Sequence, residues 1–443
     1  MVMRQSDVLE LVNDVLLPKF TSERQQLDQI DCWYRWNPEK VDIPNKASTE
    51  HRGLRDLSET PWLNLVVTTM AQQLMAEAVR SAKSKDTSRL WEPWQRNRMA
   101  AKQKPIHRAA LAYGQAFAKV LPGQVRDETA AVIKGVSPRD MIAVYQDPTD
   151  DEYPMYTLQV QGKHLIVLDE EAEYWLSNKD GEITFIEPRI HDVGVTPVIR
   201  YANQIDLEGR TPGEVEPFIP VAKRINKTSY DRLLTQHFNS WKIRTATKMD
   251  APATEAEAER LKLLLRQSDI LTGEGDVEFG TLDETPLEGF IAAWESDIQA
   301  LAAVSQTPSH SLTGQLVNLS GDALVEARSM LDLKAGERKI SFGDSHCQTL
   351  RLAAHIEDRE EDAADFSMSM QWADLESRSM TQAADALGKI ATMLGVPAEK
   401  LWDRIPGITP EVADEWLKFR QANPSAEAQM ADALMRQSNG SNG

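Results

Sequence analysis

The amino-acid sequence predicts an α+β fold, and two observations indicate it. Apolar residues recur every three or four positions in residues 1–114 and again from Pro217 onward, which is typical of amphipathic helices. Between these stretches, residues 115–202 contain short runs of apolar, β-branched and aromatic residues separated by Asp, Gly, Pro and Asn. Helices and strands that occupy separate parts of a chain are typical of the α+β class.

Composition and charge narrow the classes of function. The chain has 443 residues, 41% of them hydrophobic and 26% charged, which is ordinary for a globular protein of two or three domains. A net charge of −19 disfavours a sequence-specific nucleic-acid binder, although like charge also keeps passing DNA from adhering. The two cysteines, Cys32 and Cys347, lack metal-type spacing and indicate reduced thiols in a cytoplasmic compartment. The amphipathic N-terminus does not resemble a signal peptide, and no apolar run is long enough to span a membrane.

The first 114 residues are predicted to be mostly helical. The segment "WLNLVVTTMAQQLMAEAVRSA" (62–82) has helical apolar spacing throughout, and a later helix is expected to end near Tyr113–Gly114. The tryptophans of residues 89–95 have helix-face spacing, so we expect them in a core or a subunit interface. Residues 115–202 are predicted to form a small, mainly antiparallel sheet module, with an Asp-Gly hairpin turn in "SNKDGEI" (177–183).

A reversal of charge follows the sheet module. Residues 219–248, predicted to be largely helical, carry seven bases (Lys223, Arg224, Lys227, Arg232, Lys242, Arg244 and Lys248) and one acid, whereas residues 252–289 carry ten acids and three bases. The bases could form a solvated helix face that pairs with the following acidic segment. They could equally contact the phosphates of a polyanion, which requires Lys and Arg but no base recognition.

The C-terminal part is predicted to be helical with one strand. Helices are expected at residues 287–308 and 321–358, the second bending at Gly336 and Gly343, followed by a strand at 365–374. Compact helices follow from Ser377, and the final "QSNGSNG" should be frayed. Between the two helices, "SHSLTGQLVNLSGDAL" (309–324) is a predicted flexible loop without a basic residue. A catalytic lid, a linker or the lining of a pore would each fit its composition.

Motifs for catalysis or metal binding are not found. The sequence lacks a phosphate-binding loop, a nucleophile elbow and a His-Glu-x-x-His pattern, and "GEGDVEFG" (273–280) is predicted to be a turn. His346, His355 and Asp358 could in principle bind a metal, but a solvated helix face is the favoured interpretation. The acidic run at 357–365 is predicted to be a helix end and its solvated turn. We therefore predict no enzymatic activity, no metal and no cofactor.

The ordered set of segments resembles the phage portal proteins, in particular those of tailed phages that infect actinobacteria. The resemblance spans nearly the whole chain and rests on "PWLNLVVTTMAQQL", "LWEPWQRNRM", "HRAALAYGQAFAKVLPG", "FIPVAKRINKTSYDRLLTQHFNSWKIRTATKM", "LSGDALVEARSMLDLKAGERKISFGDSHCQTLRLAA" and "MQWADLESRSMTQAADALGKIATMLGVPAEKLWDRIPGITPEV".

The resemblance implies a portal fold, whose regions map onto the chain in order. This fold consists of a helical stem, a long support helix, a wing that contains the small β module, and a helical crown. The expected regions are the wing (1–218, helical to 114 and β-rich over 115–202), the first stem helix (219–243), the clip (244–287), the second stem helix (288–307), the channel loop (308–320), the long wing helix and return strand (321–375), and a short crown with its tail (376–443).

The resemblance also implies candidate residues for two contacts. The channel-facing candidates are Lys223, Arg224, Lys227, Lys242, Arg244, Lys248, His310, Ser311, Leu312, Gln315, Val317 and Asn318. The clip candidates for docking are Glu255, Glu257, Glu259, Asp269, Glu274, Asp276 and Glu278.

The partners implied are further copies of the chain and the machinery of the virion head. The family forms a homo-oligomeric ring of about twelve subunits at one capsid vertex. Double-stranded DNA passes through it non-specifically, and the terminase large subunit, a head-completion or adaptor protein and the major capsid protein bind it. The expected location is the virion, after assembly in the host cytoplasm, with no membrane contact. Two alternatives remain open: a metal- or nucleotide-dependent DNA-processing enzyme, and another oligomeric virion adaptor.

Overall fold

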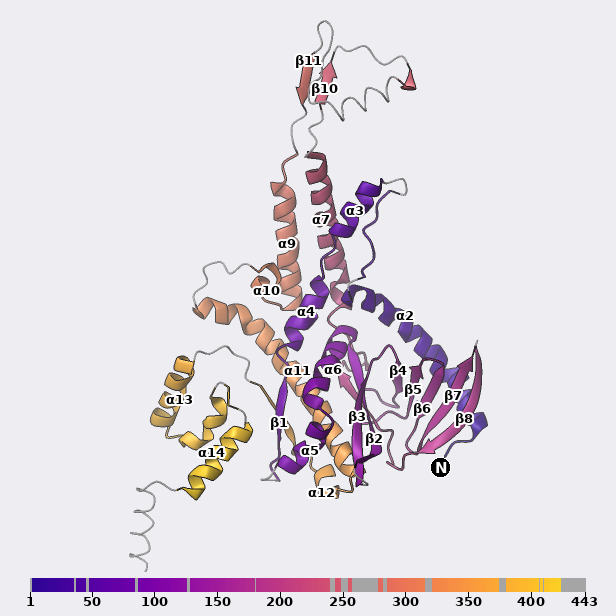
Figure 1. Cartoon of the computed structure of the whole chain (residues 1–443), viewed down its shortest axis with the longest axis vertical. Helices are drawn as coiled ribbons and strands as arrows, with labels where there is room; N and C mark the ends of the chain where they lie inside the picture. Colours follow the sequence, from indigo (N-terminus) through magenta and orange to yellow (C-terminus); the bar gives the residue numbers. More distant parts are fainter. Residues whose placement is uncertain are drawn as a thin grey trace, which may run out of the picture. The chain divides into compact units, whose positions relative to one another are not determined.

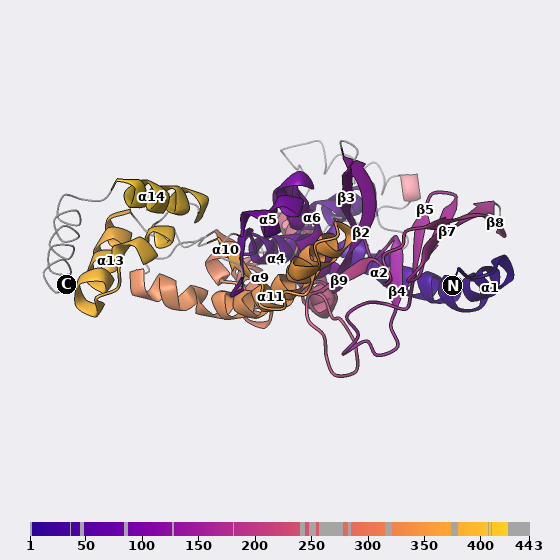
Figure 2. The ribbon, with the colours of Figure 1, turned by 90° about the horizontal axis from the view of Figure 1, so that it is seen from below.

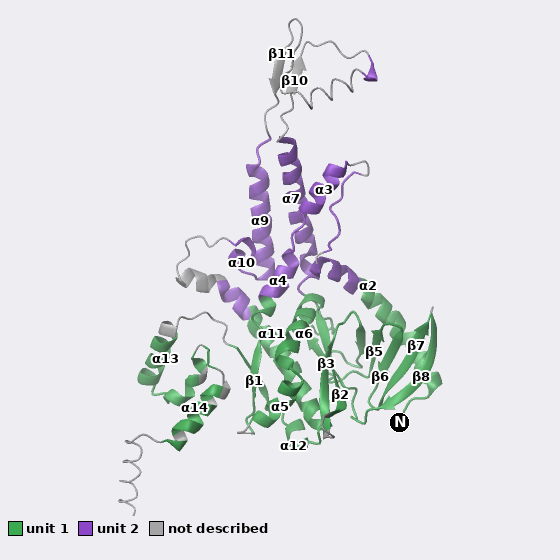
Figure 3. Ribbon diagram, in the orientation of Figure 1, with its two compact units in different colours: residues 1–25, 70–213, 334–443 green, residues 26–69, 214–333 purple. Residues whose placement is uncertain are grey.

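The computed structural model describes residues 2–35, 37–44, 48–83, 87–125, 128–179, 181–239, 244–247, 254–256, 278–281, 285–314, 321–373, 380–405, 407–408 and 410–423 (Figures 1 and 2). It contains helices and antiparallel sheets, as the predicted α+β class requires. The chain forms two compact units (Figure 3). Unit 1 comprises residues 1–25, 70–213 and 334–443, and unit 2 comprises residues 26–69 and 214–333.

The N-terminal helices of unit 1 pack against a five-stranded sheet. Helix α1 (Gln5–Leu11), the π-helical turn η1 (Val12–Leu16) and the start of α2 (Leu17–Tyr34) place a row of apolar residues at helical spacing on the sheet. Val8, Val12 and Leu16 are fully buried there. The strands follow the order β4-β5-β6-β7-β8, all antiparallel, with these bounds: β4 (Met141–Val144), β5 (Tyr156–Gln161), β6 (His164–Leu168), β7 (Ala172–Lys179) and β8 (Glu182–Ile190).

Strand β6 shows why this sheet needs apolar residues at every position. Leu165 and Val167 face the core formed with the N-terminal helices, whereas Ile166 and Leu168 face a second core. Successive side chains of a strand point to opposite faces, so a strand covered on both sides reads as a continuous apolar run. The predicted hairpin joins β7 to β8, and Gly181 adopts a left-handed φ of 90°.

The second core is shared with a three-stranded antiparallel sheet of order β3-β2-β9, formed by β2 (Gln115–Val125), β3 (Glu128–Val136) and β9 (Val198–Ala202). Helices α5 (Ser88–Arg96) and α6 (Met99–Tyr113) belong to the same unit. The end of α6 at Tyr113 confirms the prediction, and Gly114 closes it with φ of 95°. Trp91 and Trp94 of α5 are buried, as expected of the tryptophan-rich segment.

The predicted helix over residues 62–82 is wrong in its second half. Helix α4 spans Trp62–Ala71 only, and Ala76–Arg80 form strand β1. This strand pairs antiparallel with β12 (Ser369–Trp372), the strand predicted in the C-terminal part. The side chain of Gln103 also exchanges hydrogen bonds with the backbone of Ala76, at 2.9 and 3.2 Å. The tertiary partners of the segment therefore override its helical apolar spacing.

Unit 2 is mainly helical. It contains α3 (Thr49–Leu57), most of α4, the turn η2 (Glu216–Phe218) and the long helices α7 (Ile219–Asn239) and α9 (Glu288–Ser305). Two short strands, β10 (Arg244–Thr247) and β11 (Glu278–Thr281), pair antiparallel. The bounds of α7 and α9 lie within the predicted stem helices, and the division of the chain into named portal regions stays a prediction.

The loop predicted at residues 309–324 is partly helical. Ser309–Thr313 form the short helix α10, which Pro308 precedes and Gly314, with φ of 68°, ends. Proline before a helix and a left-handed glycine after it are common boundaries. Residues 315–320 lie outside the described residues, and α11 begins at Gly321.

Helix α11 (Gly321–Ile356) confirms the predicted long helix and runs without interruption through Gly336 and Gly343. The short helix α12 (Glu360–Ala363) and strand β12 follow it. The predicted C-terminal helices are present as α13 (Met380–Leu394), η3 (Ala398–Lys400), η4 (Trp402–Arg404) and α14 (Pro410–Ala422). The tail predicted to be frayed lies outside the described residues.

Candidate functional site: the helix pair α7 and α9

Helices α7 and α9 pack side by side in unit 2 (Figure 1). Their buried residues recur at three- and four-residue spacing: Ala222, Ile225, Asn226, Ser229 and Tyr230 on α7, and Ile298, Leu301, Ala302 and Ser305 on α9. Only one stripe of each helix is therefore buried, which leaves the remaining faces free to carry charge.

Three of the four bases of α7, namely Lys223, Arg224 and Lys227, form ion pairs with carboxylates of the same unit. Arg224 donates to Asp297 of α9 with an Nε–Oδ1 distance of 2.7 Å, and Thr228 lies 3.4 Å from the other oxygen of that carboxylate. Lys223 donates to Glu39 at 3.0 Å, and Lys227 pairs with Asp231 one turn along α7. Each basic side chain still exposes about half of its surface.

These contacts modify both interpretations of the basic helix. Lys223, Lys227 and Arg224 form ion pairs with Glu39, Asp231 and Asp297, respectively. Most of the acidic segment 252–289 lies outside the described residues, so pairing with that segment stays a prediction. Arg224 additionally joins the two helices, because its partner belongs to α9. A polyanion that approached α7 would compete with these carboxylates for the same cations.

Aromatic contacts attach α3 and α4 to the helix pair. Trp62 of α4 meets Trp294 of α9 edge to face, with ring centroids 6.1 Å apart. His51 of α3 meets Phe238 near the end of α7 at 5.8 Å. Edge-to-face pairs at these distances are favourable beyond the apolar area that they bury. Residues 49–69 therefore support the helix pair within unit 2, a role that the sequence did not reveal.

The channel-loop candidates divide into a described and an undescribed group. His310 and Ser311 are half-buried on α10, whereas Leu312 is only 6% exposed, so its side chain packs within the chain. Gln315, Val317 and Asn318 lie outside the described residues, as do Lys242 and Lys248.

The clip candidates are mostly undescribed. Glu255 is exposed, and the backbones of Arg244 and Glu278 lie on the paired strands β10 and β11. Glu257, Glu259, Asp269, Glu274 and Asp276 lie outside the described residues. Whether these acids share a surface stays a prediction.

A buried polar network in unit 1 escaped sequence analysis. His346 of α11 is fully buried; its Nε2 lies 2.8 Å from Nε2 of His107 and its Nδ1 lies 2.9 Å from the hydroxyl of Tyr201. The hydroxyl of Tyr201 also contacts Thr349 at 2.8 Å, and Nδ1 of His107 lies 3.2 Å from the carbonyl of Leu74. Burial lowers the pKa of His107 to about 4 and lowers that of His346 well below its usual value.

The possible metal site at His346, His355 and Asp358 does not form. His346 is committed to the buried network, whereas His355 lies against Glu360 and the carbonyl of Val193. The prediction of a solvated helix face is also wrong for His346. In the described part of the chain, no group of three or more His, Cys, Asp or Glu side chains is arranged to hold a metal ion.

The acidic run at 357–365 is less solvated than predicted. Helix α11 does end there, at Ile356, but the Glu357 side chain is only 10% exposed. It accepts hydrogen bonds from the backbone of Ala131 at 3.0 Å and from Arg359 at 2.9 Å, and it pairs with Arg96. This carboxylate therefore ties the helix end to β3 and α5. The cysteines Cys32 and Cys347 are unpaired, as predicted.

Comparison with known proteins identifies the class to which this fold belongs. The chain matches the sequence profile "Phage portal protein, SPP1 Gp6-like" over residues 14–425, and it therefore belongs to this family of phage portal proteins. Members of the family are structural proteins of the capsid, and membership implies a homo-oligomeric ring at a capsid vertex.

Two further comparisons add detail. No curated protein matches the chain. A solved structure titled "Neck of empty GTA particle computed with C6 symmetry" is similar at a TM-score of 0.43 and 9% identity, over 80% of this chain and 92% of that chain. Within the described residues, no helix has both the length and the apolar character needed to cross a membrane.

Proposed function

We propose that the chain assembles into a ring of about twelve subunits that conducts double-stranded DNA into and out of the phage head. The observation that carries the proposal is the family match over residues 14–425. The order of elements supports it, because two packed helices flank the acidic segment expected to form the clip.

The helix pair α7 and α9 is the proposed stem. Each helix buries one stripe of residues, an ion pair joins the two helices, and an aromatic contact joins α9 to α4. These contacts would make the helix pair rigid, as the wall of a channel requires. Residues 219–243 and 288–307 would form the two stem helices, 308–320 the channel loop, 1–218 with 321–375 the wing, and 376–443 the crown.

The charge of the chain suits a conduit that does not retain its cargo. A net charge of −19 per chain repels DNA overall, so each subunit added to a ring increases the repulsion. Lys223, Arg224 and Lys227 can contact phosphates only in competition with their own carboxylates. We therefore expect weak phosphate contacts that decrease further as salt concentration rises.

The proposed protein partners bind outside the channel. The acidic segment 244–287 would attract basic faces of the terminase large subunit during packaging and of the head-completion or adaptor protein afterwards. The wing would contact the major capsid protein at the vertex of the virion, after assembly in the host cytoplasm. ATP hydrolysis would be the task of the terminase, and the chain itself would act without catalysis or cofactor.

Packaging with altered channel loops tests the proposal. Gln315, Val317 and Asn318 are replaced together by Glu, and Leu312 is left unchanged because its side chain is buried. We expect heads that contain this variant to package or retain less DNA, since acidic side chains at the channel repel phosphates. Electron micrographs should still show rings.

A triple Glu variant at three exposed neutral positions of unit 1, Ile186, Ile190 and Leu207, introduces the same charge, serves as the matched control and should package normally. Loss of ring formation in the loop variant, or unimpaired packaging by it, would contradict the proposed position of the loop.

A further inference from the structure

One base of the helix pair has no partner among the described residues. Helix α7 carries Lys223, Arg224, Lys227 and Arg232, and the first three pair with carboxylates of the same chain. Arg232 makes no hydrogen bond or ion pair within the described part of the chain, and its Nε is buried without an acceptor. Burying an N–H group of a charged guanidinium costs free energy unless an acceptor meets it. The surroundings of Arg232 are therefore incomplete in a single chain.

Helix α9 has the opposite imbalance of charge. It contains three acids, Glu288, Glu295 and Asp297, and no Lys, Arg or His. Asp297 pairs with Arg224, whereas Glu288 and Glu295 are exposed and have no ion-pair partner among the described residues. DNA that approached this helix would meet two carboxylates that no base neutralises, so DNA fits α9 poorly. A basic protein surface fits it better, and α7 of another copy is such a surface.

The antiparallel register of the helix pair places Arg232 and Glu288 at nearly the same level. Arg224 forms its ion pair with α9 at one level, and at another the side chain of Asn239, which ends α7, exchanges hydrogen bonds with the backbone of Thr285 at 2.8 and 3.3 Å. Arg232 lies about midway between these contacts on α7. Glu288 lies within about one helical turn, or about 5 Å, of the corresponding midpoint on α9. Within one chain, the two side chains nevertheless form no ion pair.

We propose that α9 of one copy packs against α7 of the next copy around the ring, with Glu288 of one copy paired to Arg232 of its neighbour. The contact presupposes the proposed ring, whose wall the helix pair would form. Rotation about the ring axis does not change the height of a residue along that axis, so Glu288 of the neighbouring copy stands at the level of Arg232. Both groups then gain a partner of opposite charge, and every interface of the ring repeats the same contact.

Charge reversal at either residue should prevent this contact. Arg232→Glu places two carboxylates opposite each other, and Glu288→Arg places two guanidinium groups there. We expect the concentration of full-length chain at which half of it forms rings, measured by analytical ultracentrifugation, to rise at least about tenfold in either variant. Circular dichroism and thermal unfolding should show that the unassembled variants fold like the wild type, because neither residue belongs to the buried stripe of its helix.

An equimolar mixture of the two variants gives the decisive measurement. Arg232→Glu chains and Glu288→Arg chains can alternate around a ring, and every interface of that ring then joins opposite charges. We expect the mixture to form rings at a concentration within about twofold of the wild-type value. Recovery on mixing requires contact between copies, because neither a pair within one chain nor a contact of Arg232 with DNA would be restored. Normal assembly of either variant alone, or no recovery in the mixture, would overturn the proposal.

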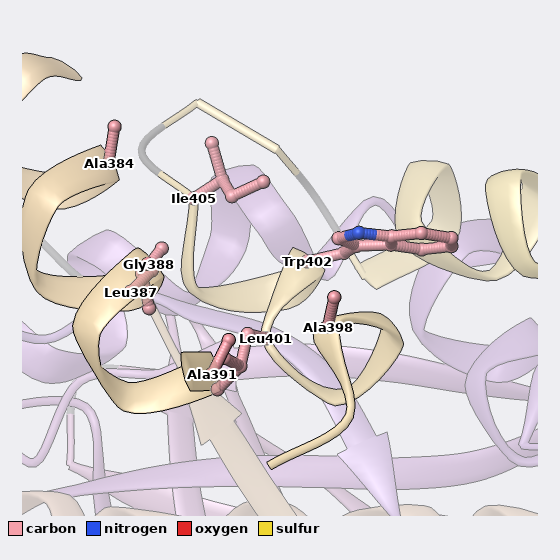
Figure 4. Close-up of a pocket in the computed structure, with 8 residues that line it drawn as sticks. All are labelled: Ala384, Leu387, Gly388, Ala391, Ala398, Leu401, Trp402 and Ile405. Atoms are coloured by element: carbon pink, nitrogen blue, oxygen red, sulfur yellow. The ribbon is translucent and has the colours of Figure 1, made fainter. Parts of the chain in front are cut away.

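Lys389→Glu is the matched control for Arg232→Glu. Lys389 lies on α13 of unit 1, next to Gly388, which lines an open apolar groove (Figure 4), and it pairs with Asp385 of the same helix at 2.7 Å. This variant makes the same change of charge outside the helix pair and should assemble like the wild type. Rings of the wild type together with a mixture that does not recover would overturn the interface alone. A wild-type chain that forms no rings would contradict the proposed function, and the interface with it.

Discussion

Two histidines of unit 1, His107 and His346, are buried, and burial lowers the pKa of both. For His107 the effect of burial outweighs the hydrogen bond to the carbonyl of Leu74, which favours the charged form. When both histidines are neutral, each side chain of this network has one hydrogen to donate. The hydrogen bonds between the rings can then all run in one direction. Tyr201 donates to Nδ1 of His346, and Nε2 of His346 donates to His107. His107 then donates to the carbonyl of Leu74. The Thr349 hydroxyl beside Tyr201 donates to the carbonyl of Ser345. A further proton on either ring would place an imidazolium in a buried site and against the other ring.

The first prediction concerns the pH dependence of stability. The folded pKa of His107 is about 4 and lies below its unfolded value of about 6.5, so the unfolded chain binds more protons between these values. Stability is therefore complete above pH 6.5 and decreases as pH falls toward 4. His107 alone should account for about 3 kcal/mol of this loss, and His346 adds to it in the same direction.

Denaturant unfolding measured from pH 7 to pH 4 checks this expectation. The double variant His107→Gln/His346→Gln should lose less stability over this range than the wild type. His164→Gln, at an exposed position on β6, should follow the wild type. Parallel curves for the wild type and the double variant would show that the buried pair does not titrate as described.

The second prediction concerns Gly114 at the end of α6. A Cβ atom there would stand 1.8 Å from the carbonyl oxygen of Thr211, and the φ of 95° already disfavours any other residue. Gly162 has φ of 63° but open space around it, so Gly162→Ala carries the backbone cost alone. We expect Gly162→Ala to lose about 1 kcal/mol of unfolding free energy and Gly114→Ala to lose about 3 kcal/mol or more. Equal losses in thermal or denaturant unfolding would refute the close approach.

At the scale of elements, the pair α7 and α9 depends on its buried stripes and on one ion pair that crosses between them. Asp297 is largely shielded, with 16% of its side chain exposed, whereas Arg224 is 55% exposed. Lys227 and Asp231 form a comparison pair within α7, with both side chains more exposed than Asp297. The cross-helix pair should therefore be coupled more strongly than the pair within one helix.

The third prediction follows from this difference. A double-mutant cycle with Arg224→Ala and Asp297→Ala should give a coupling of about 1 kcal/mol in unfolding free energy. The cycle with Lys227→Ala and Asp231→Ala should give about 0.3 kcal/mol, as is usual for exposed pairs on one helix. Both couplings should decrease in 1 M salt. A coupling near zero between Arg224 and Asp297 would contradict the prediction, because the ion pair would then not stabilise the contact between α7 and α9.

The sequence predicted best those elements whose apolar residues follow one clear pattern along the whole element. The strands of residues 115–202 were predicted from short apolar, β-branched and aromatic runs between turn residues. The helices α7, α9 and α11 were predicted from an apolar period of three to four that persists over many residues. Strand β1 was missed because the apolar spacing of residues 62–82 also fits a helix, whereas the strand depends on pairing with β12, far along the chain. Short helix α10 was missed because the glycines around it suggested a loop.

The site was predictable only in outline. The charge reversal located the helix pair and the acidic segment, but Glu39 and Asp297, the partners of Lys223 and Arg224, cannot be read from spacing. His346 looked like a surface residue because α11 carries polar residues all around, and only the packing of His107, Tyr201 and Trp94 reveals its burial. The sequence pattern does not show which distant segments of the chain come into contact, and these contacts determine the site.

At the scale of the whole molecule, the chain combines a portal family match with a strongly negative charge and two compact units. The proposed ring repeats the same surfaces around an axis, so that each subunit contacts its neighbours through two different faces. A closed ring of this kind creates an axial channel that a single chain cannot have. The proposed function therefore depends on assembly more than on any single residue.

Electron microscopy of the purified full-length chain, with symmetry assigned from the images, tests this claim most directly. We expect closed rings of about twelve subunits with an axial channel at least about 20 Å wide, which admits duplex DNA, and with α7 and α9 along its wall. Particles without a channel, or rings whose wall is built by other elements, would contradict the account.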